Sequence, residues 1–134
     1  KQKTAYEIYQ CDWSSDVCSS DLEVTKGFGW IKGSVKKIKL CNKDLKLPHM
    51  GWNEVNIVKK NDLFLNIENL SHFYFVHSYA FEAENINHVV CITDYEKSVV
   101  AALLKENIFG TQFHPEKSQD NGIKLLSNFL NWNL

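Results

Sequence analysis

The residues of this sequence best suited to chemistry are a histidine and a glutamate separated by one proline, His114 and Glu116. In an extended chain, residues two apart point to the same side, so the carboxylate can lie beside the imidazole. There it would fix the tautomer of the ring and stabilise the imidazolium that forms when the ring accepts a proton. Because Pro115 favours extended backbone, the pattern predicts that the pair forms before any helix begins. A surface ion pair is the other interpretation of this spacing, and it is the commoner one.

The elements around this pair predict an α/β fold. Apolar segments at 72–79, 88–93, 99–104 and 107–114 are interpreted as strands, the first as one buried on both faces. His114 ends the last strand, and in open α/β sheets functional groups gather beyond the carboxyl ends of strands. The candidate caps for a helix that follows are Ser118, Asp120 and Asn121. Apolar residues further on share one face of this predicted helix: Ile123, Leu126, Phe129 and Leu130.

The first half of the chain predicts loops and shorter elements. Residues 27–40 are interpreted as a loop and then a strand, because their glycines lack the G-x-G-x-x-G spacing of a phosphate-binding loop. PHMGWN, residues 48–53, is predicted to be a loop by its proline and glycine, and residues 55–58 suit a strand at the edge of a sheet. Apolar residues at helical spacing predict a helical turn within 61–70, capped by Asn61 or Asp62.

Composition and charge exclude several classes of protein. The 134 residues are 44% hydrophobic and 23% charged, enough for one domain. No run of about 18 apolar residues predicts a membrane span, and no secretory leader is recognised, so we expect no membrane and a cytoplasmic location. All 15 basic residues are lysine, against 16 acidic residues. Without a basic excess or an arginine, nucleic acid is not expected as a partner.

Residues 1–22 are predicted not to be native protein sequence. KQKTAYEI and DWSSDVCSSDL match the translation of two stretches of a short-read sequencing adapter, with room for a sample index between them. We therefore expect the native part to be 23–134, the C-terminal portion of one domain whose beginning is missing.

The cysteines and remaining histidines do not predict a metal site. In residues 23–134 only Cys41 and Cys91 remain, fifty apart and without a C-x-x-C motif, so free thiols are expected. Four histidines lack partners at metal-ligand spacing and are interpreted as structural. They are His49, His72, His77 and His88. No metal and no cofactor are predicted.

The segment GTQFHPEKS, residues 110–118, resembles the C-terminal signature of class I glutamine amidotransferases. The resemblance implies the C-terminal part of a flavodoxin-like, doubly wound α/β domain, with glutamine as substrate and a Cys-His-Glu triad. His114 would then be the general base and acid, and Glu116 its orienting carboxylate. The chemistry agrees, because a thiol with a pKa of about 8.5 needs an imidazole to form thiolate, and the departing nitrogen needs a proton.

Two further segments resemble the glutaminase subunits of imidazole glycerol phosphate synthases. HFYFVHSYA is similar to the strand and loop that hold glutamine, which implies Ser78 and Tyr79 as substrate-binding residues. PHMGWN and the lysine after the glutamate imply Trp52, Asn53 and Lys117 as contacts with a partner. The resemblance implies that this partner is a cyclase (β/α)8 barrel, which would form a heterodimer with the chain and receive ammonia for histidine biosynthesis. The alternatives are core positions for Trp52 and Tyr79 and a solvated charge for Lys117.

The chain departs from this family at the nucleophile. The family places its cysteine in a G-x-C-x-G elbow upstream of residues 27–30, where this sequence has the adapter-like segment. Cys18, Cys41 and Cys91 lack the flanking glycines. We therefore expect the 134-residue polypeptide to have no glutaminase activity. The functions left open are an ammonia-supplying paralogue for bacterial surface sugars, an amidotransferase of anthranilate or purine synthesis, and a non-catalytic partner-binding module.

Overall fold

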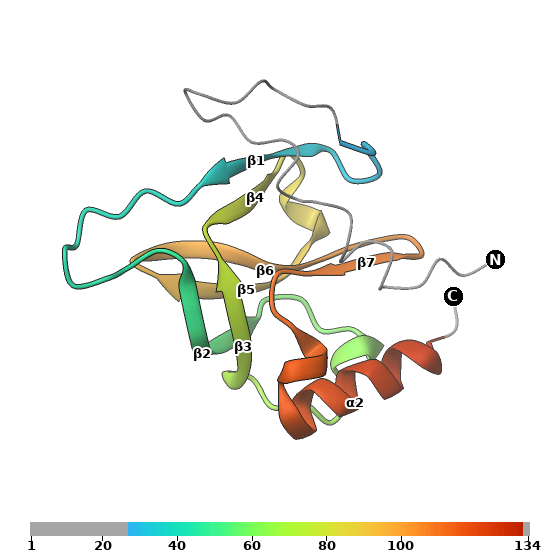
Figure 1. Ribbon diagram of the computed structural model, residues 1–134. Helices are drawn as coiled ribbons and strands as arrows, with labels where there is room; N and C mark the ends of the chain where they lie inside the picture. Colours follow the sequence, from blue (N-terminus) through green and yellow to red (C-terminus); the bar gives the residue numbers. More distant parts are fainter. Residues whose placement is uncertain (1–26, 133–134) are drawn as a thin grey trace.

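Two antiparallel sheets form most of the structure, a computed structural model that describes residues 27–132 (Figure 1). The five strands of the larger sheet are β2 (His49–Ile57), β3 (Ser71–His77), β5 (Val89–Tyr95), β6 (Lys97–Lys105) and β7 (Ile108–Thr111), in the order β3-β2-β5-β6-β7. The smaller sheet pairs β1 (Gly33–Lys37) with β4 (Tyr79–Ala83). The adapter-like segment, residues 1–22, lies outside the described residues.

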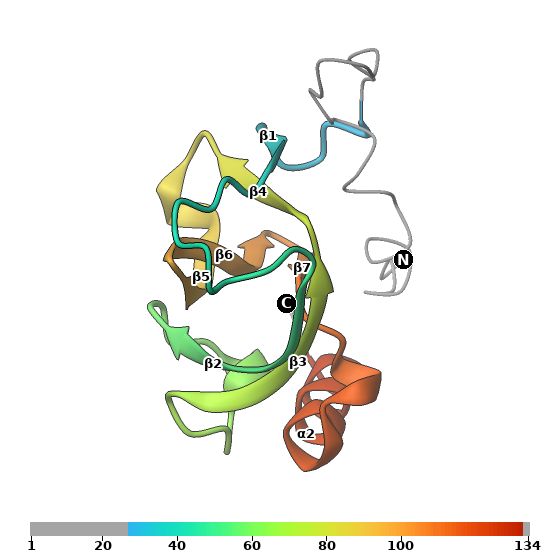
Figure 2. The same cartoon turned by 60° about the vertical axis from the view of Figure 1, so that its left-hand side comes forward.

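A single long path of chain joins the two sheets. Only Ser78 separates β3 from β4, and Figure 2 shows the two strands as one curved ribbon that passes from the larger sheet into the smaller one. The strand predicted over 72–79 is therefore divided between two sheets. Along β3 the burial alternates, with Phe73, Phe75 and His77 buried and His72 exposed. The prediction of a strand buried on both faces is thus wrong, because one face of β3 is partly open to solvent.

The helix α2 (Gln119–Leu130) packs beside β3, against two short 3-10 turns (Figure 1). These turns are η2 (Asp62–Phe64) and η4 (Pro115–Lys117), and a third, η3 (Ile86–His88), precedes β5. The predicted helix and the predicted turn capped by Asn61 are confirmed, since the Asn61 side chain accepts a hydrogen bond from the Leu63 backbone N–H at 3.0 Å. The largest buried side chains of the main core come from these elements, the sheet and the segment between β7 and η4: Leu63, Phe73, Phe75, Phe109, Phe113 and Leu125.

All of PHMGWN except Pro48 forms the first half of a strand, so the prediction of a loop there is wrong. The peptide bond before Pro48 is cis, and β2 begins at the next residue and pairs with β3 from His49 opposite His77 to Val55 opposite Ser71. Gly51, with a φ of 120°, lies within this strand. Proline and glycine therefore mark the entry and a local distortion of the strand. The predicted edge position is also wrong, since β2 lies between β3 and β5.

No helix within residues 27–132 is both long and apolar enough to cross a membrane. In the same residues no cluster of three or more His, Cys, Asp or Glu side chains is arranged to hold a metal ion.

Every strand pairing described in the two sheets is antiparallel. The expected α/β character comes from α2, which covers the β3 side of the larger sheet.

Candidate active site

The predicted pair of His114 and Glu116 forms, with His114 Nδ1 and Glu116 Oε1 2.8 Å apart. The backbone differs from the prediction of an extended chain. His114 is extended, with φ −96° and ψ 96°, but Pro115 opens the 3-10 turn η4, which contains Glu116. Proline suits this first position because its fixed φ matches a helix and its missing N–H would have no partner there. The turn brings the carboxylate back to the ring.

The surroundings of His114 favour a neutral ring. Burial lowers the pKa of His114 below its ordinary value of 6.5; the Glu116 carboxylate opposes that effect, and the Lys117 ammonium adds to it. The His114 side chain is 19% exposed and the Glu116 side chain 39%. At neutral pH the imidazole is therefore ready to accept a proton, with a carboxylate at its other nitrogen to orient it.

A buried serine fixes this turn to β3, and sequence reasoning missed its role. The Ser118 hydroxyl donates to the His114 carbonyl at 2.6 Å and accepts from the Tyr74 N–H at 3.0 Å. The His114 N–H donates to the Tyr74 carbonyl at 2.8 Å. Ser118 is 1% exposed, and its side chain makes no capping bond to α2, unlike the cap that the sequence predicts. A serine before a helix looks the same in the sequence whether it caps the helix or forms hydrogen bonds to a distant strand. Only the fold distinguishes the two roles.

The proposed partner contacts gather around the ring of Tyr74. The Trp52 ring lies 6.0 Å from that of Tyr74, edge to face, and the His114 ring lies 6.4 Å from it, also edge to face. The Lys117 Nζ is 5.9 Å from the centre of the Tyr74 ring. Trp52 is 47% exposed, so its interpretation as a core aromatic is wrong. The structure thus brings Trp52 and Lys117 to one partly exposed surface beside His114.

Asn53 is held by the protein rather than free on that surface. Its Nδ2 lies 3.1 Å from His49 Nε2 and donates to the Asp94 carbonyl at 2.9 Å. Its Oδ1 accepts from the Glu54 N–H at 2.8 Å. All three contacts fix the amide orientation.

Ser78 and Tyr79 lie where β3 passes into β4. The Ser78 carbonyl accepts from the Ile38 N–H at 2.9 Å, and the Tyr79 carbonyl lies 2.9 Å from His77 Nδ1. Tyr79 is partly buried and packs against the smaller core around Val35 and Phe81. Both predicted substrate-binding residues therefore have fixed backbone carbonyls, on the same run of chain as Tyr74.

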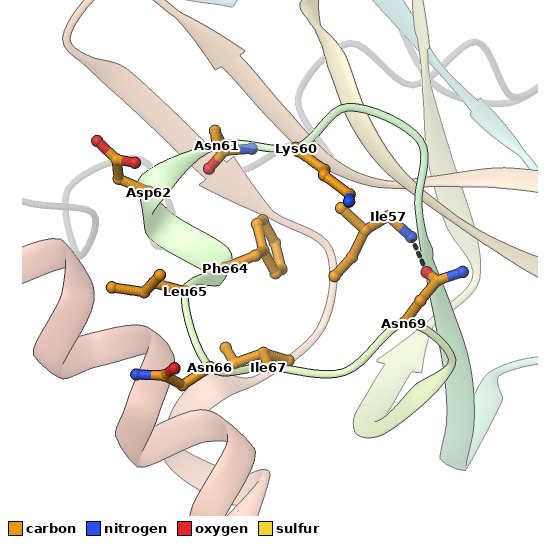
Figure 3. A pocket seen from close by; sticks show the side chains of 9 residues that line it. All are labelled: Ile57, Lys60, Asn61, Asp62, Phe64, Leu65, Asn66, Ile67 and Asn69. Atoms are coloured by element: carbon orange, nitrogen blue, oxygen red, sulfur yellow. Dashed lines mark hydrogen bonds between the residues drawn. The ribbon is translucent and has the colours of Figure 1, made fainter.

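The remaining sequence-derived groups lie elsewhere. Cys41 is exposed and Cys91 is buried in β5, and both are free. Burial raises the pKa of the Cys91 thiol. A hollow of about 640 Å³ lies inside the loop between β2 and β3, where Ile57 and Phe64 point into it (Figure 3). Its lining contains none of the predicted site residues.

A histidine and a carboxylate held together beyond the last strand can accept and return a proton beside a nucleophile. The model of the family described as glutamine amidotransferase class-I matches residues 24–132, and the chain belongs to this family. The predicted family and fold class are thereby confirmed. The chain is 55% identical over 107 residues to an imidazole glycerol phosphate synthase subunit HisH of Pelagibacter ubique, covering 80% of this chain and 51% of that protein.

Two further proteins are similar to the chain, one in sequence and one in fold. A HisH subunit of Azospirillum brasilense is 46% identical over 109 residues, covering 81% of this chain and 57% of that protein. In fold, the structure resembles a candidate GMP synthase subunit of Thermoplasma acidophilum, with a TM-score of 0.59 at 19% identity, over 74% of this chain and 47% of that one. The chain spans about half the length of the curated relatives it matches.

Proposed function

We propose that this chain is the C-terminal part of a glutaminase subunit that hydrolyses glutamine and delivers ammonia to a cyclase (β/α)8-barrel partner for imidazole glycerol phosphate synthesis. The contact between His114 and Glu116, 2.8 Å long, carries the proposal. The HisH relatives, at 46–55% identity, support the choice of pathway within the family.

In the proposed reaction, neutral His114 takes the proton of a cysteine thiol. The thiolate attacks the carboxamide carbon of glutamine, and His114 returns the proton to the nitrogen as the C–N bond breaks and ammonia leaves. The same imidazole then takes a proton from water, and the resulting hydroxide attacks the thioester carbon. The C–S bond breaks, glutamate leaves, and the imidazolium returns its proton to the cysteine thiolate. Glu116 holds the ring with Nδ1 toward the carboxylate, so that Nε2 accepts and returns the proton.

In this proposal the attacking thiol belongs to the native sequence that the intact gene encodes where this chain has residues 1–22. Cys91 does not suit the role, since it is buried within a strand and its pKa is raised. Cys41 follows a lysine-rich segment without the glycines of a nucleophile elbow. We therefore propose that the 134-residue chain has no glutaminase activity by itself. Sequencing the intact gene tests the origin of residues 1–22, and finding them encoded there would contradict it.

The decisive assay measures glutamate release by the complete gene product with its cyclase partner. His114→Ala is expected to lower kcat at least about 100-fold, because the proton transfer is lost. Glu116→Gln keeps the shape and removes the charge that orients the ring. Lys124→Ala, an exposed change on α2, serves as the matched control. Unchanged glutamate release by His114→Ala would refute the proposed reaction.

The partner surface is tested separately by binding. Trp52→Ala is expected to weaken capture of the cyclase barrel, since exposed aromatic residues are common hot spots of interfaces. Ile86→Ala is the control, because Ile86 is also apolar and is 75% exposed, at η3. Equal capture by the two variants would contradict the interface at Trp52.

The native upstream sequence separates this function from the alternatives. A G-x-C-x-G elbow ahead of residue 27 supports the enzyme, and its absence supports a non-catalytic partner-binding module. Neighbouring genes for histidine biosynthesis or for surface sugars would separate the two ammonia acceptors.

A further inference from the structure

Two buried histidines face each other across β2 and β3. His49 and His77 are paired in the strand register, and His49 Nδ1 lies 2.9 Å from His77 Nε2. His49 is 3% exposed and His77 is 9% exposed. On either side the chain of contacts continues, from His77 to the Tyr79 carbonyl and from His49 to the Asn53 amide.

The direction of every hydrogen bond in this chain follows from one fixed end. A carbonyl only accepts, so His77 Nδ1 carries a proton and donates to Tyr79. With His77 neutral, its Nε2 accepts, and His49 Nδ1 must donate to it. His49 Nε2 then accepts from Asn53 Nδ2. Each of the four groups is satisfied, and no second arrangement of protons on two neutral rings satisfies them.

The surroundings keep both rings neutral. The Tyr95 ring stacks on His49 with centroids 3.9 Å apart, and the Phe75 ring lies 4.8 Å from it. Burial lowers the pKa of His49 to about 4, and burial also lowers the pKa of His77. A second proton on either ring would point one donor at another, so the chain of bonds would break.

The bend that lets His49 reach Asn53 lies at Gly51. Residues four apart in a straight strand are about 13 Å apart at Cα, too far for these side chains to touch. Gly51 stands between them on the same face with a φ of 120°, a conformation that glycine adopts readily. A Cβ added to Gly51 would meet no atom within 4 Å, so glycine is required here for the backbone conformation and not for space.

We propose that His49 and His77 are positioning residues of the glutaminase site, linking Asn53 on the partner side to the Tyr79 carbonyl on the substrate side through a one-way hydrogen-bond relay. The inference rests on the proposed function for what Asn53 and Tyr79 contact. His77 fixes the peptide group that follows Tyr79, and Asn53 fixes the ring that fixes His77. A displacement of Asn53 by a partner therefore reaches the substrate-binding backbone through two rings.

The tautomers provide a test that does not depend on activity. In the complete gene product with 15N-labelled histidine, long-range 1H–15N spectra at pH 7 are expected to show His49 and His77 protonated at Nδ1 and bare at Nε2. Single variants at each position assign the signals. A proton on Nε2 of either ring would overturn the relay, whatever the protein catalyses.

Two substitutions at His77 distinguish its bond to the Tyr79 carbonyl from its bond to His49. His77→Asn keeps a donor near the place of Nδ1, so the bond to the Tyr79 carbonyl is retained while the link from Nε2 to His49 is lost. Its KM for glutamine is therefore expected to rise only as far as that of Asn53→Ala. His77→Gln loses that donor, and its KM is expected to rise about fivefold with kcat little changed. The control is His72→Gln, the same change at an exposed position of β3. Equal KM values for His77→Asn and His77→Gln would overturn the proposal.

A double-mutant cycle tests the link to Asn53, with the partner at saturating concentration. Asn53→Ala is expected to raise the KM, and adding it to His77→Gln is expected to raise the KM no further. Additive effects would overturn the link. If His114→Ala leaves activity intact, the proposed function fails; if His114→Ala abolishes activity and the His77 variants match the parent, only the relay fails.

Discussion

Gly122 offers a direct test of how η4, the turn that contains Glu116, is built. It lies in the first turns of α2, buried against η4, and its N–H donates to the Ser118 carbonyl at 3.1 Å. A Cβ added here would lie 2.8 Å from the Pro115 carbonyl carbon and 3.0 Å from Ser118 Cβ, and nearer still to the Pro115 oxygen. Carbon atoms in contact are about 3.5–4.0 Å apart, so α2 and the turn would have to separate by about 1 Å.

The expected cost of Gly122→Ala follows from two opposing effects. Overpacking against backbone costs about 3 kcal/mol, the upper part of the usual range, because no side chain can rotate away. Alanine is favoured over glycine in a helix by about 1 kcal/mol. The net loss is therefore about 2 kcal/mol in the free energy of unfolding. Since Pro115 follows His114 directly, a displacement of about 1 Å would also lower glutaminase activity about 100-fold.

Equilibrium urea unfolding of the complete gene product measures the first effect and glutamate release the second. Ser127→Ala is the matched control, since it places alanine at an exposed position of the same helix. It is expected to keep or slightly raise stability. A Gly122→Ala protein as stable and active as the Ser127→Ala protein would refute the close packing of α2 on the turn.

Three further predictions concern buried groups. Burial lowers the pKa of His49 from 6.5 to about 4. Between pH 6.5 and pH 4 the unfolded chain therefore binds a proton at this residue that the folded chain excludes. The free energy of unfolding is thus expected to fall by up to about 3 kcal/mol from pH 7 to pH 4. Urea unfolding across this range should show less dependence on pH in His49→Gln, and an equal dependence would contradict the assignment. Ser118→Ala removes the buried hydroxyl that joins the partly buried Tyr74 N–H to the partly buried His114 carbonyl, and is expected to cost about 2 kcal/mol in the same assay. A loss below about 0.5 kcal/mol would show that the hydroxyl is dispensable. Iodoacetamide should alkylate exposed Cys41 in the folded protein and spare Cys91 until it unfolds, as peptide mass spectrometry can establish; rapid labelling of Cys91 would mean that β5 is open to solvent.

The sequence was most informative where one local signal determines the outcome. The predicted strands over 88–93 and 99–104 correspond to β5 and β6, and the apolar face after Pro115 became α2. The contact between His114 and Glu116 was also predicted, although through an extended chain, because two-residue spacing permits it both in a strand and in a short turn.

The failures share a physical cause, which is that distant segments decided the outcome. PHMGWN contains proline and glycine, and its pairing with β3 overrides that local preference for a loop. The spacing of His49 and His77 in the sequence shows only that they do not suit a metal site, whereas their contact depends on the strand register between β2 and β3. Ser118 reaches Tyr74 across 44 residues of chain, a contact that no local pattern predicts.

Ser78 lies at the point where the chain passes from β3 in the larger sheet to β4 in the smaller one. Because Ser78 alone joins β3 of the larger sheet to β4 of the smaller one, any movement of one sheet against the other must bend the chain at this residue, which then acts as a hinge. The peptide groups of Ser78 and Tyr79 are the ones such a movement would turn. The affinity for a ligand bound to these peptide groups would therefore depend on the angle between the two sheets.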